Sequence, residues 1–370
     1  MPEINETFAR WSELFMYLAA LTYMFAFIAF SWDVAANSRI TKRLEAAQES
    51  KKELVGAGVG GKSASVPAAV ISSTEQGTGA RGMGYQRVAT AKISAHVADS
   101  DMRYGSGERR PAARAAVAIM VLGCLVHAAG VGTRGLAAHR VPWGNMYEFC
   151  TTGAFLVTAV FLVFLVFRDL RFVGTLVSGL ALVMMTAATM GFNTPVGQLK
   201  PALQSYWLVI HVSIAVLASA VFTITFAMAV LQLVQTARER QILADQDTSL
   251  TRMGFMRLIP SATALENFAF RLNTVGFAMW TFTLAAGAIW AEKAWGRYWG
   301  WDTKEVWTFI IWVVYAAYLH ARATRGWSGP PSAWLSIAGY LCIIFNFTVV
   351  NVFFSGLHSY SGALIDKLDP

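Results

Sequence analysis

Two apolar segments joined by a short aromatic connection decide the fold. They are FAFRLNTVGFAMWTFTLAAGAIW, residues 268–290, and VWTFIIWVVYAAYLHA, residues 306–321. A helix that crosses the hydrocarbon core of a bilayer needs about 20 mostly apolar residues. We therefore expect each of the two segments to cross a membrane and their connection to lie at the membrane surface.

The rest of the chain repeats this pattern. Of its 370 residues, 55% are hydrophobic and 14% are charged, which leaves too little polar surface for a soluble protein of this length. We predict an all-α, polytopic membrane helix bundle of about eight transmembrane helices. The predicted spans are approximately Leu14–Ser31, Ala113–Gly130, Glu148–Phe167, Phe172–Met190, Tyr206–Val234, Phe268–Trp290, Val306–Ala321 and Ala333–Phe353.

The formal net charge of +8 does not indicate a nucleic-acid partner, because the basic residues lie mostly between the apolar segments. Lysine and arginine collect in cytoplasmic connections of membrane proteins. Alternate connections carry them: residues 33–110, Arg168 with Arg171, Arg238 with Arg240, and Arg322 with Arg325. The pattern predicts that these four connections are cytoplasmic and that both termini lie outside.

Three regions follow from this reading: a first span in residues 1–32, a long basic loop in residues 33–111, and a transmembrane core in residues 112–370. The middle of the loop is rich in Gly, Ser, Ala and Val without apolar periodicity, which is typical of disorder. Its first part, SRITKRLEAAQESKKEL (residues 38–54), contains helix formers and opposite charges that favour a polar extension of the first helix.

The three cysteines, Cys124, Cys150 and Cys342, lie inside or at the edge of apolar segments. The chain has no C-x-x-C motif, which argues against a thiol–disulfide carrier, and no C-x-x-C-H, which argues against a c-type cytochrome. We interpret the cysteines as small buried apolar residues.

The connection and its borders read WGRYWGWDTKEVW, residues 295–307, which we call the Trp motif. An interfacial aromatic belt explains one or two such residues, but less easily four Trp with two Gly among them. The motif therefore predicts a flat aromatic surface for a large planar ligand. Trp295 and Trp299 share a face if the segment is helical. Gly296 and Gly300 permit a tight turn or the close approach of a ligand.

The charged residues of the Trp motif have two readings. Asp302 can orient a cationic or histidine side chain, and it can cap the next helix with Glu305 as its partner in a D-x-x-E capping box. We expect the capping role in either case. Lys304 and Arg297 are candidates to meet acidic groups of the planar ligand.

Three histidines lie at membrane-related positions downstream of residue 200. His211 is about five residues inside its span, where it is either a ligand or an interhelical hydrogen-bonding residue. His358 follows the last span on the outer side, where it is either a ligand or an ordinary residue of the tail. His320 lies about 27 Å from Asp302 along one helix, near the opposite membrane face, where it is either a ligand or an interfacial residue beside Arg322. Two outer histidines and an aromatic platform suit haem.

Two further histidines have weaker indications. His139 precedes RVPWGNMYEF (residues 140–149), in which Pro142, Asn145, Tyr147 and Glu148 indicate a structured turn that starts a helix. We expect this segment to shape the outer vestibule or to contact a partner, with ligation by His139 as the alternative. His127 lies inside a span beside small residues, where it is either a helix-packing residue or a second intramembrane ligand, and we favour packing.

The Trp motif, with His211 before it and His320 and His358 after it, resembles the WWD motif of the CcsA/ResC family of cytochrome c maturation, called CcsB in some bacteria. The similarity covers residues ~112 to 370 and includes RVPWGNMYEF. The resemblance implies a multi-pass protein of the bacterial cytoplasmic membrane. It also implies one half of the System II cytochrome c synthase, a haem lyase complex that includes a ResB-type membrane partner.

The resemblance also implies the roles of the residues. Haem b moves across the membrane and is presented outside, where its vinyl groups form thioethers with the CxxCH thiols of a secreted apocytochrome c. His211 and His358 would be the two outer axial ligands of the iron. His320 would ligate at an inner site whose second ligand belongs to the partner, and a thiol-reducing protein is a further candidate partner. The residues implied to bind the haem and expose it for reaction are Trp295, Gly296, Tyr298, Trp299, Gly300, Trp301 and Asp302.

Two alternatives stay open from the sequence. One is a haem-containing electron-transfer subunit of the cytochrome b kind, although such proteins usually pair their histidines at buried depth on facing helices. The other is a plain haem exporter, since transport is also part of the synthase reading.

Overall fold

The structure is a computed structural model that describes residues 3–58, 110–244, 246, 248–324, 326–354 and 356–358. Within these ranges every long regular element is a helix and no strand occurs. The long helices are α1 (Glu6–Gly58), α3 (Pro111–Ala138), α4 (Met146–Phe167), α5 (Gly174–Thr186), α6 (Tyr206–Leu243), α7 (Ala262–Trp295), α8 (Thr303–Thr324) and α9 (Pro330–Phe347). Short helices are η2 (Arg171–Val173), η3 (Ala187–Gly191), η4 (Pro201–Leu203), η5 (Gly254–Leu258) and α10 (Val349–Phe353).

Eight helical segments of the described chain are long and apolar enough to cross a membrane, which confirms the predicted all-α membrane bundle. Two of them are composite. The fourth joins η2, α5 and η3 over Arg171–Gly191, and the eighth joins α9 and α10 over Pro330–Phe353. A helix satisfies its own backbone hydrogen bonds, so it crosses a bilayer without leaving unpaired polar groups in the hydrocarbon.

Helix α1 continues well beyond its apolar part. Its 53 residues correspond to about 80 Å at 1.5 Å per residue, whereas the segment suited to a membrane is Glu6–Ala36. Residues 33–58 of the predicted loop are therefore helical, as the helix formers of residues 38–54 indicate. Residues 59–109 of that loop, with His96, lie outside the described residues.

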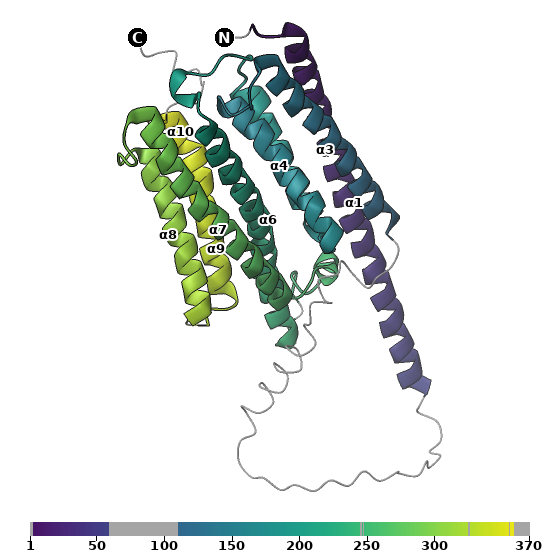
Figure 1. Ribbon diagram of the computed structural model, residues 1–370. Coiled ribbons are helices and arrows are strands. Elements are labelled where there is room, and N and C mark those ends of the chain that lie inside the picture. The colour runs from purple at the N-terminus through teal and green to yellow at the C-terminus, as the bar shows by residue number, and fades with distance from the viewer. Residues whose placement is uncertain are drawn as a thin grey trace.

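The helices form two groups (Figure 1). Helices α1, α3 and α4 lie side by side in one half, α7, α8 and α9 lie in the other, and α6 stands between them. The connection of residues 296–302 lies at the end of the bundle that is uppermost in Figure 1, which we call the Trp-motif end. The described chain also begins, at Glu3, and ends, at His358, at this end.

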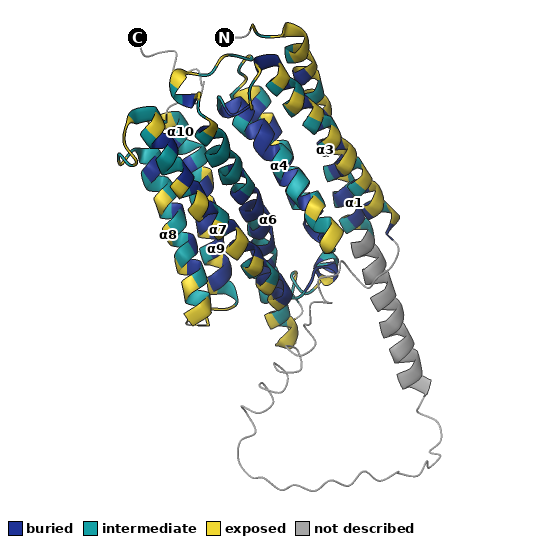
Figure 2. Ribbon diagram, in the orientation of Figure 1, coloured by how far each residue is buried: buried dark blue, intermediate teal, exposed yellow. Residues whose placement is uncertain are grey.

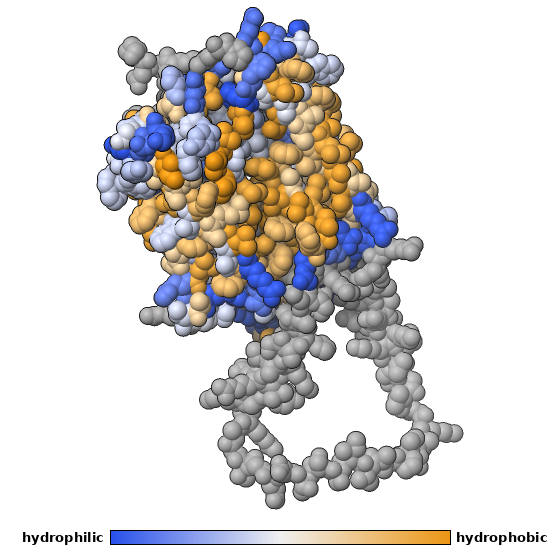
Figure 3. Space-filling view, in the orientation of Figure 1, coloured by the Kyte–Doolittle hydropathy of each residue, from blue (hydrophilic) through white to orange (hydrophobic). Residues whose placement is uncertain are grey.

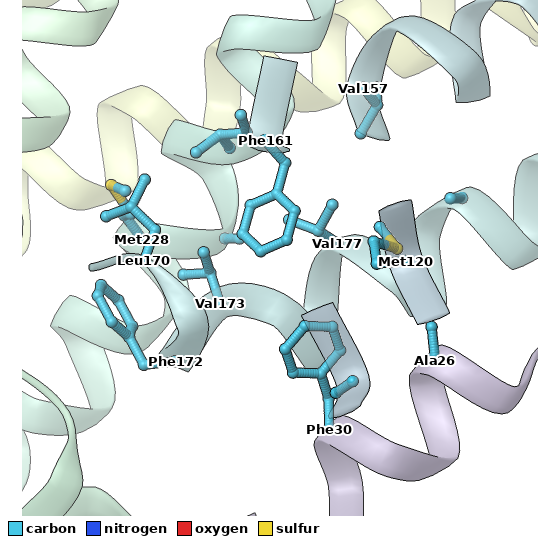
Figure 4. Close-up of a cluster of buried hydrophobic side chains, with 14 of the residues drawn as sticks. Ala26, Phe30, Met120, Val157, Phe161, Leu170, Phe172, Val173, Val177 and Met228 are labelled. Atoms are coloured by element: carbon cyan, nitrogen blue, oxygen red, sulfur yellow. The ribbon is translucent and has the colours of Figure 1, made fainter. Parts of the chain in front are cut away.

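Close packing holds each half together, because lipid tails are as apolar as the side chains and give little hydrophobic drive. In the first half, the Phe30, Phe161 and Val177 side chains meet in one cluster (Figure 4). In the second half, the rings of Phe222 on α6 and Tyr315 on α8 stack with centroids 3.8 Å apart. Gly276 permits this approach, since a Cβ there would lie 2.7 Å from the Phe222 ring.

The surface of the bundle matches a lipid environment. An apolar band covers the middle of the molecule and hydrophilic residues gather at both ends (Figure 3). Exposed residues run along the outer side of α1 (Figure 2), among them the large apolar side chains of Trp11, Phe25 and Trp32. In water such a surface would favour aggregation, whereas in a bilayer it faces lipid.

Candidate functional site

A cavity of about 390 Å³ opens at the Trp-motif end and has a mostly apolar lining. Its wall on α6 runs from Leu208 to Thr223, which corresponds to about 22 Å along the helix. Helices α4, α5, α7, α8 and α9 supply the other walls. Pockets of this size, with an apolar lining and a few polar groups, are typical of small-molecule and cofactor sites. His211 and His358 line this same cavity although 147 residues separate them in the chain.

The His211 imidazole is held by helix α7. Its Nδ1 lies 2.9 Å from the carbonyl oxygen of Thr283, so Nδ1 carries the proton and donates to that oxygen. Its ring stacks on Trp290, with centroids 5.9 Å and planes 12° apart. Gly287 makes room for the ring, because a Cβ there would lie 2.7 Å from the His211 Cε1. The arrangement leaves Nε2 as the nitrogen with a lone pair.

The His358 imidazole is held by Asp302 in a similar way. Its Nδ1 lies 3.0 Å from Asp302 Oδ1, and the N–H of Leu357 donates to Asp302 Oδ2 at 2.9 Å. Gly356 allows the chain to pass here, since a Cβ would lie 2.4 Å from Oδ2. Partial burial raises the pKa of Asp302, but the hydrogen bond and charge of His358 and two backbone N–H donors lower it to about 2. The ionised carboxylate accepts a hydrogen bond from the Nδ1–H group of His358, so the lone pair of this imidazole lies on Nε2.

Both histidines contact one indole. The centroid of Trp290 lies 5.9 Å from that of His211 and 5.5 Å from that of His358. Trp290 is buried, and its Nε1 donates to the carbonyl oxygen of Ala202 at 3.2 Å. Trp295 completes the cluster, with its centroid 4.7 Å from Trp290 and 4.9 Å from His358. Trp290 is not among the site residues predicted from the sequence, although its position five residues before Trp295 is a signal that the aromatic cluster extends into the helix.

The Trp motif is helical only at its two ends. Helix α7 ends at Trp295, and Gly296 takes a left-handed conformation, with φ of 72°, that turns the chain. The condition under which Trp295 and Trp299 share a helical face is therefore not met, because the left-handed Gly296 breaks the helix between them. Tyr298 and Trp299 line the cavity, whereas Trp301 is 74% exposed and packs edge-on against Trp299.

The predicted capping box forms at the start of α8. Asp302 accepts from the N–H of Lys304 at 2.9 Å, and Glu305 Oε2 accepts from the N–H of Asp302 at 3.1 Å. Glu305 also accepts from the N–H of Gly300 at 2.8 Å, so it fixes the turn that precedes the helix. Asp302 thus performs both of the roles considered for it, since one side chain caps α8 and orients His358.

Arg297 and Lys304, the two cations of the Trp motif, are placed differently. Lys304 lines the cavity, and its Nζ donates to the carbonyl oxygen of Asn346 at 3.1 Å and to Asn351 Oδ1. Arg297 is exposed and does not line the cavity. Its guanidinium lies over Gly300, where a Cβ would meet it.

The wall on the α4 side is built around Glu148, as the pattern of RVPWGNMYEF indicates. Asn145 caps α4 by accepting from the N–H of Glu148 at 2.9 Å. The buried Glu148 carboxylate pairs with Arg134 at 3.0 Å and with Arg140 at 2.8 Å. Trp143 lines the cavity, and its Nε1 donates to the hydroxyl of Ser213 on α6 at 3.2 Å. The ion pairs hold α4 to α3 and to the connection before α4, and the Trp143 hydrogen bond holds that connection to α6.

The other three histidines in the described part of the chain do not line the cavity. His320 is exposed near the other end of α8, so that Asp302 and His320 mark opposite ends of one helix, as predicted. His139 is exposed at the end of α3. His127 is buried, and its Nδ1 lies 3.1 Å from the hydroxyl of Tyr23 on α1, which agrees with the packing role expected for it.

The fold and this cavity define a polytopic membrane protein with a tryptophan-lined site that carries two oriented histidines. The family described as "Cytochrome C assembly protein" matches residues 143–358, which include both histidines and the Trp motif. The chain therefore belongs to this family, and its relatives place it in the CcsA/ResC group.

Among these relatives, the "Cytochrome c biogenesis protein CcsA" of Guillardia theta is 33% identical over 255 residues, covering 65% of this chain and 83% of that protein. The protein of the same name from Microcystis aeruginosa is 35% identical over 272 residues, covering 63% and 83%. A solved structure titled "Cytochrome c Heme Lyase CcmF" aligns with a TM-score of 0.46 and 16% identity, covering 76% of this chain and 49% of that one.

Proposed function

We propose that this protein is the haem-presenting subunit of a cytochrome c synthase. In this role it holds haem b at the outer membrane face with His211 and His358 as axial ligands. Family membership supports a part in cytochrome c maturation and in haem handling. The observation that carries the finer proposal is the common cavity in which both histidines have Nδ1 engaged and Nε2 free.

The hydrogen bonds of the two histidines suit ligation of iron. A histidine ligand usually donates its second ring N–H to a carbonyl or carboxylate, which fixes the tautomer and makes the ligating nitrogen more basic. The Thr283 carbonyl does this for His211, and the Asp302 carboxylate does it for His358. The apolar lining and the indoles of Trp290, Trp295 and Trp299 suit the faces and edges of a porphyrin.

The reaction proposed at this site is addition of a thiol to a vinyl group. The sulfur of each CxxCH cysteine bonds to a vinyl carbon, the thiol proton passes to the other vinyl carbon, and the net reaction consumes no oxidant. The protein contributes mainly by positioning, because it holds the substrate in one orientation toward the incoming thiols. The CxxCH histidine can then replace one axial histidine as the product leaves.

The proposal includes partners that supply what this chain lacks. A ResB-type membrane protein would provide the second ligand of an inner haem site at His320, whose exposed position on α8 is accessible to another chain. A secreted apocytochrome c would bring the thiols to the Trp-motif end, and a thiol-reducing protein would keep them reduced. The positive-inside pattern supports an orientation with both termini outside. Similarity to bacterial relatives such as that of Microcystis aeruginosa supports a location in the bacterial cytoplasmic membrane.

Cytochrome c maturation in cells that carry His211→Gly or His358→Gly tests the proposal. We expect covalent cytochrome c to be lost, the purified complex to lose its haem, and added imidazole to restore both, because imidazole fits the space of the missing side chain. Normal maturation in the double variant would refute the axial-ligand assignment. Stable haem without transfer to an apocytochrome would instead indicate an electron-transfer protein.

A further inference from the structure

Lys304 is a charged side chain of the cavity that the histidine pair does not explain. It lines the same cavity as His211 and His358, and it projects from the first turn of α8 toward α9 and α10. An ammonium group has three N–H donors. Two of them are used by the Asn346 carbonyl oxygen and by Asn351 Oδ1, which leaves one donor for a ligand.

The surroundings of Lys304 do not neutralise its charge by a direct ion pair. Among the described residues, no carboxylate forms an ion pair with its Nζ. The two acidic residues next to Lys304 in the chain are Asp302 and Glu305. The charge of Asp302 acts on Lys304 through space, but its carboxylate is bound by His358 and by the N–H of Leu357. Glu305 is held by the N–H groups of Gly300 and Asp302. A cation at an apolar cavity is costly unless a counter-charge arrives, so the site favours an anionic ligand.

Asn346 gives a second, independent indication. It is 5% exposed and lines the same cavity, and its side-chain Oδ1 is buried without a hydrogen-bond partner in the described structure. Its Nδ2 donates to the hydroxyl of Thr308 at 3.3 Å, which fixes the direction of the amide. The spare donor of Lys304 suits an ionised carboxylate, which accepts from the ammonium group. The unused Oδ1 of Asn346 suits a water molecule that donates to both the amide oxygen and that carboxylate.

We propose that Lys304 and Asn346 form a seat for one propionate carboxyl group of the haem substrate. This inference rests on the proposed function and deepens it. Propionates and vinyl groups occupy different edges of the porphyrin. A propionate fixed between α8 and α9 therefore selects one orientation of the ring and decides which edge remains for the thiols. Arg297, the other cation of the Trp motif, takes no part in the seat because it lies outside the cavity.

Titration of the haem-depleted complex with haem and with haem dimethyl ester, followed by absorbance, tests the seat. The ester keeps the iron, ring and vinyl groups but lacks the carboxylates. We expect wild-type protein to bind haem about tenfold more tightly than the ester, because one charge-assisted hydrogen bond is lost. Lys304→Gln should bind both compounds equally, at the level of the ester, whereas Arg297→Gln should keep the tenfold preference.

Equal binding of haem and ester by the wild-type protein would overturn the proposal, even if Lys304→Gln cannot be purified. The same conclusion would follow if Lys304→Gln kept the preference, or if Arg297→Gln alone lost it. Failure of the proposed function gives a different result, since His211→Gly and His358→Gly would then bind both compounds as the wild type does.

Discussion

The Oδ1 atom of Asp302 lies 3.0 Å from the Nδ1 atom of His358, although 56 residues separate them in the chain. The same carboxylate caps helix α8 through the N–H of Lys304. The orientation of His358 is thus tied to the start of a transmembrane helix, where the backbone is rigid. A histidine on the short segment that follows α10 gains in this way the precision of a helix-borne residue.

Replacing Asp302 by Asn should separate its two roles. Asparagine is as good a helix cap as aspartate, so α8 should form normally. The His358 ring loses its charged partner, and losses of this kind reduce metal affinity by about 10–100-fold. We expect a comparable fall in the haem retained by the purified complex, measured by absorbance. Unchanged haem retention would show that the hydrogen bond between Asp302 and His358 does not contribute to haem binding.

The pH dependence of stability gives a second test of this pair. The pKa of Asp302 is lowered to about 2, so the unfolded protein binds the proton at higher pH than the folded protein does. The resulting stability is present above the ordinary pKa of aspartate, about 3.9, and is lost as the pH falls toward 2. The melting temperature of Asp302→Asn should lie below that of wild type at pH 7, and the difference should shrink below pH ~4. A difference that stays constant to pH 2 would contradict this.

Gly287→Ala should disturb the site while leaving the helix intact. The added Cβ would lie 2.7 Å from the imidazole of His211, so the ring must move away from the Thr283 carbonyl oxygen. We expect about tenfold weaker haem binding by titration, the lower end of the range for lost ligand orientation. Gly132→Ala in α3 is the matched control, since nothing lies within 4 Å of its added Cβ. Equal behaviour of the two variants would argue against a fixed His211.

Trp290→Leu should weaken the site at both histidines together. Each aromatic contact contributes about 0.5–1.5 kcal/mol, and Trp290 makes one with each imidazole. We expect about tenfold less haem retention in the Leu variant and a smaller loss in Trp290→Phe, which keeps a ring. Trp334→Leu is the control, because this residue of α9 is 61% exposed. Wild-type retention in Trp290→Leu would remove Trp290 from the site.

Glu148→Gln should destabilise the wall of the cavity. The change leaves Arg134, which is 1% exposed, without the carboxylate that neutralises it. Removing one partner of a buried ion pair costs about 3–5 kcal/mol. We expect a clearly lower melting temperature of the complex, whereas Asp169→Asn, which affects a more exposed pair with Arg171, should cost about 1 kcal/mol or less. Similar melting temperatures for the two variants would contradict the role of Glu148.

Features that depend on neighbouring residues could be predicted from the amino-acid sequence. Hydrophobic runs fixed eight spans, because a bilayer admits only helices of sufficient length and apolarity. The D-x-x-E pattern at Asp302 and Glu305 fixed the start of α8, and Asn145 fixed the start of α4. Each of these signals acts within one turn or one helix, so it can be read without knowledge of the partner helices.

Which distant groups meet depends instead on how the helices pack. The Thr283 carbonyl oxygen and Trp290 meet His211 because α6 and α7 pack in one rotational register, which no local pattern specifies. Lys304 and Arg297 are equivalent candidates in the sequence, yet of the two only Lys304 lines the cavity. Helix α8 carries Lys304, whereas Arg297 follows the left-handed turn at Gly296. Helix packing is set by many weak contacts across the bundle, so the composition of the site follows from the whole fold.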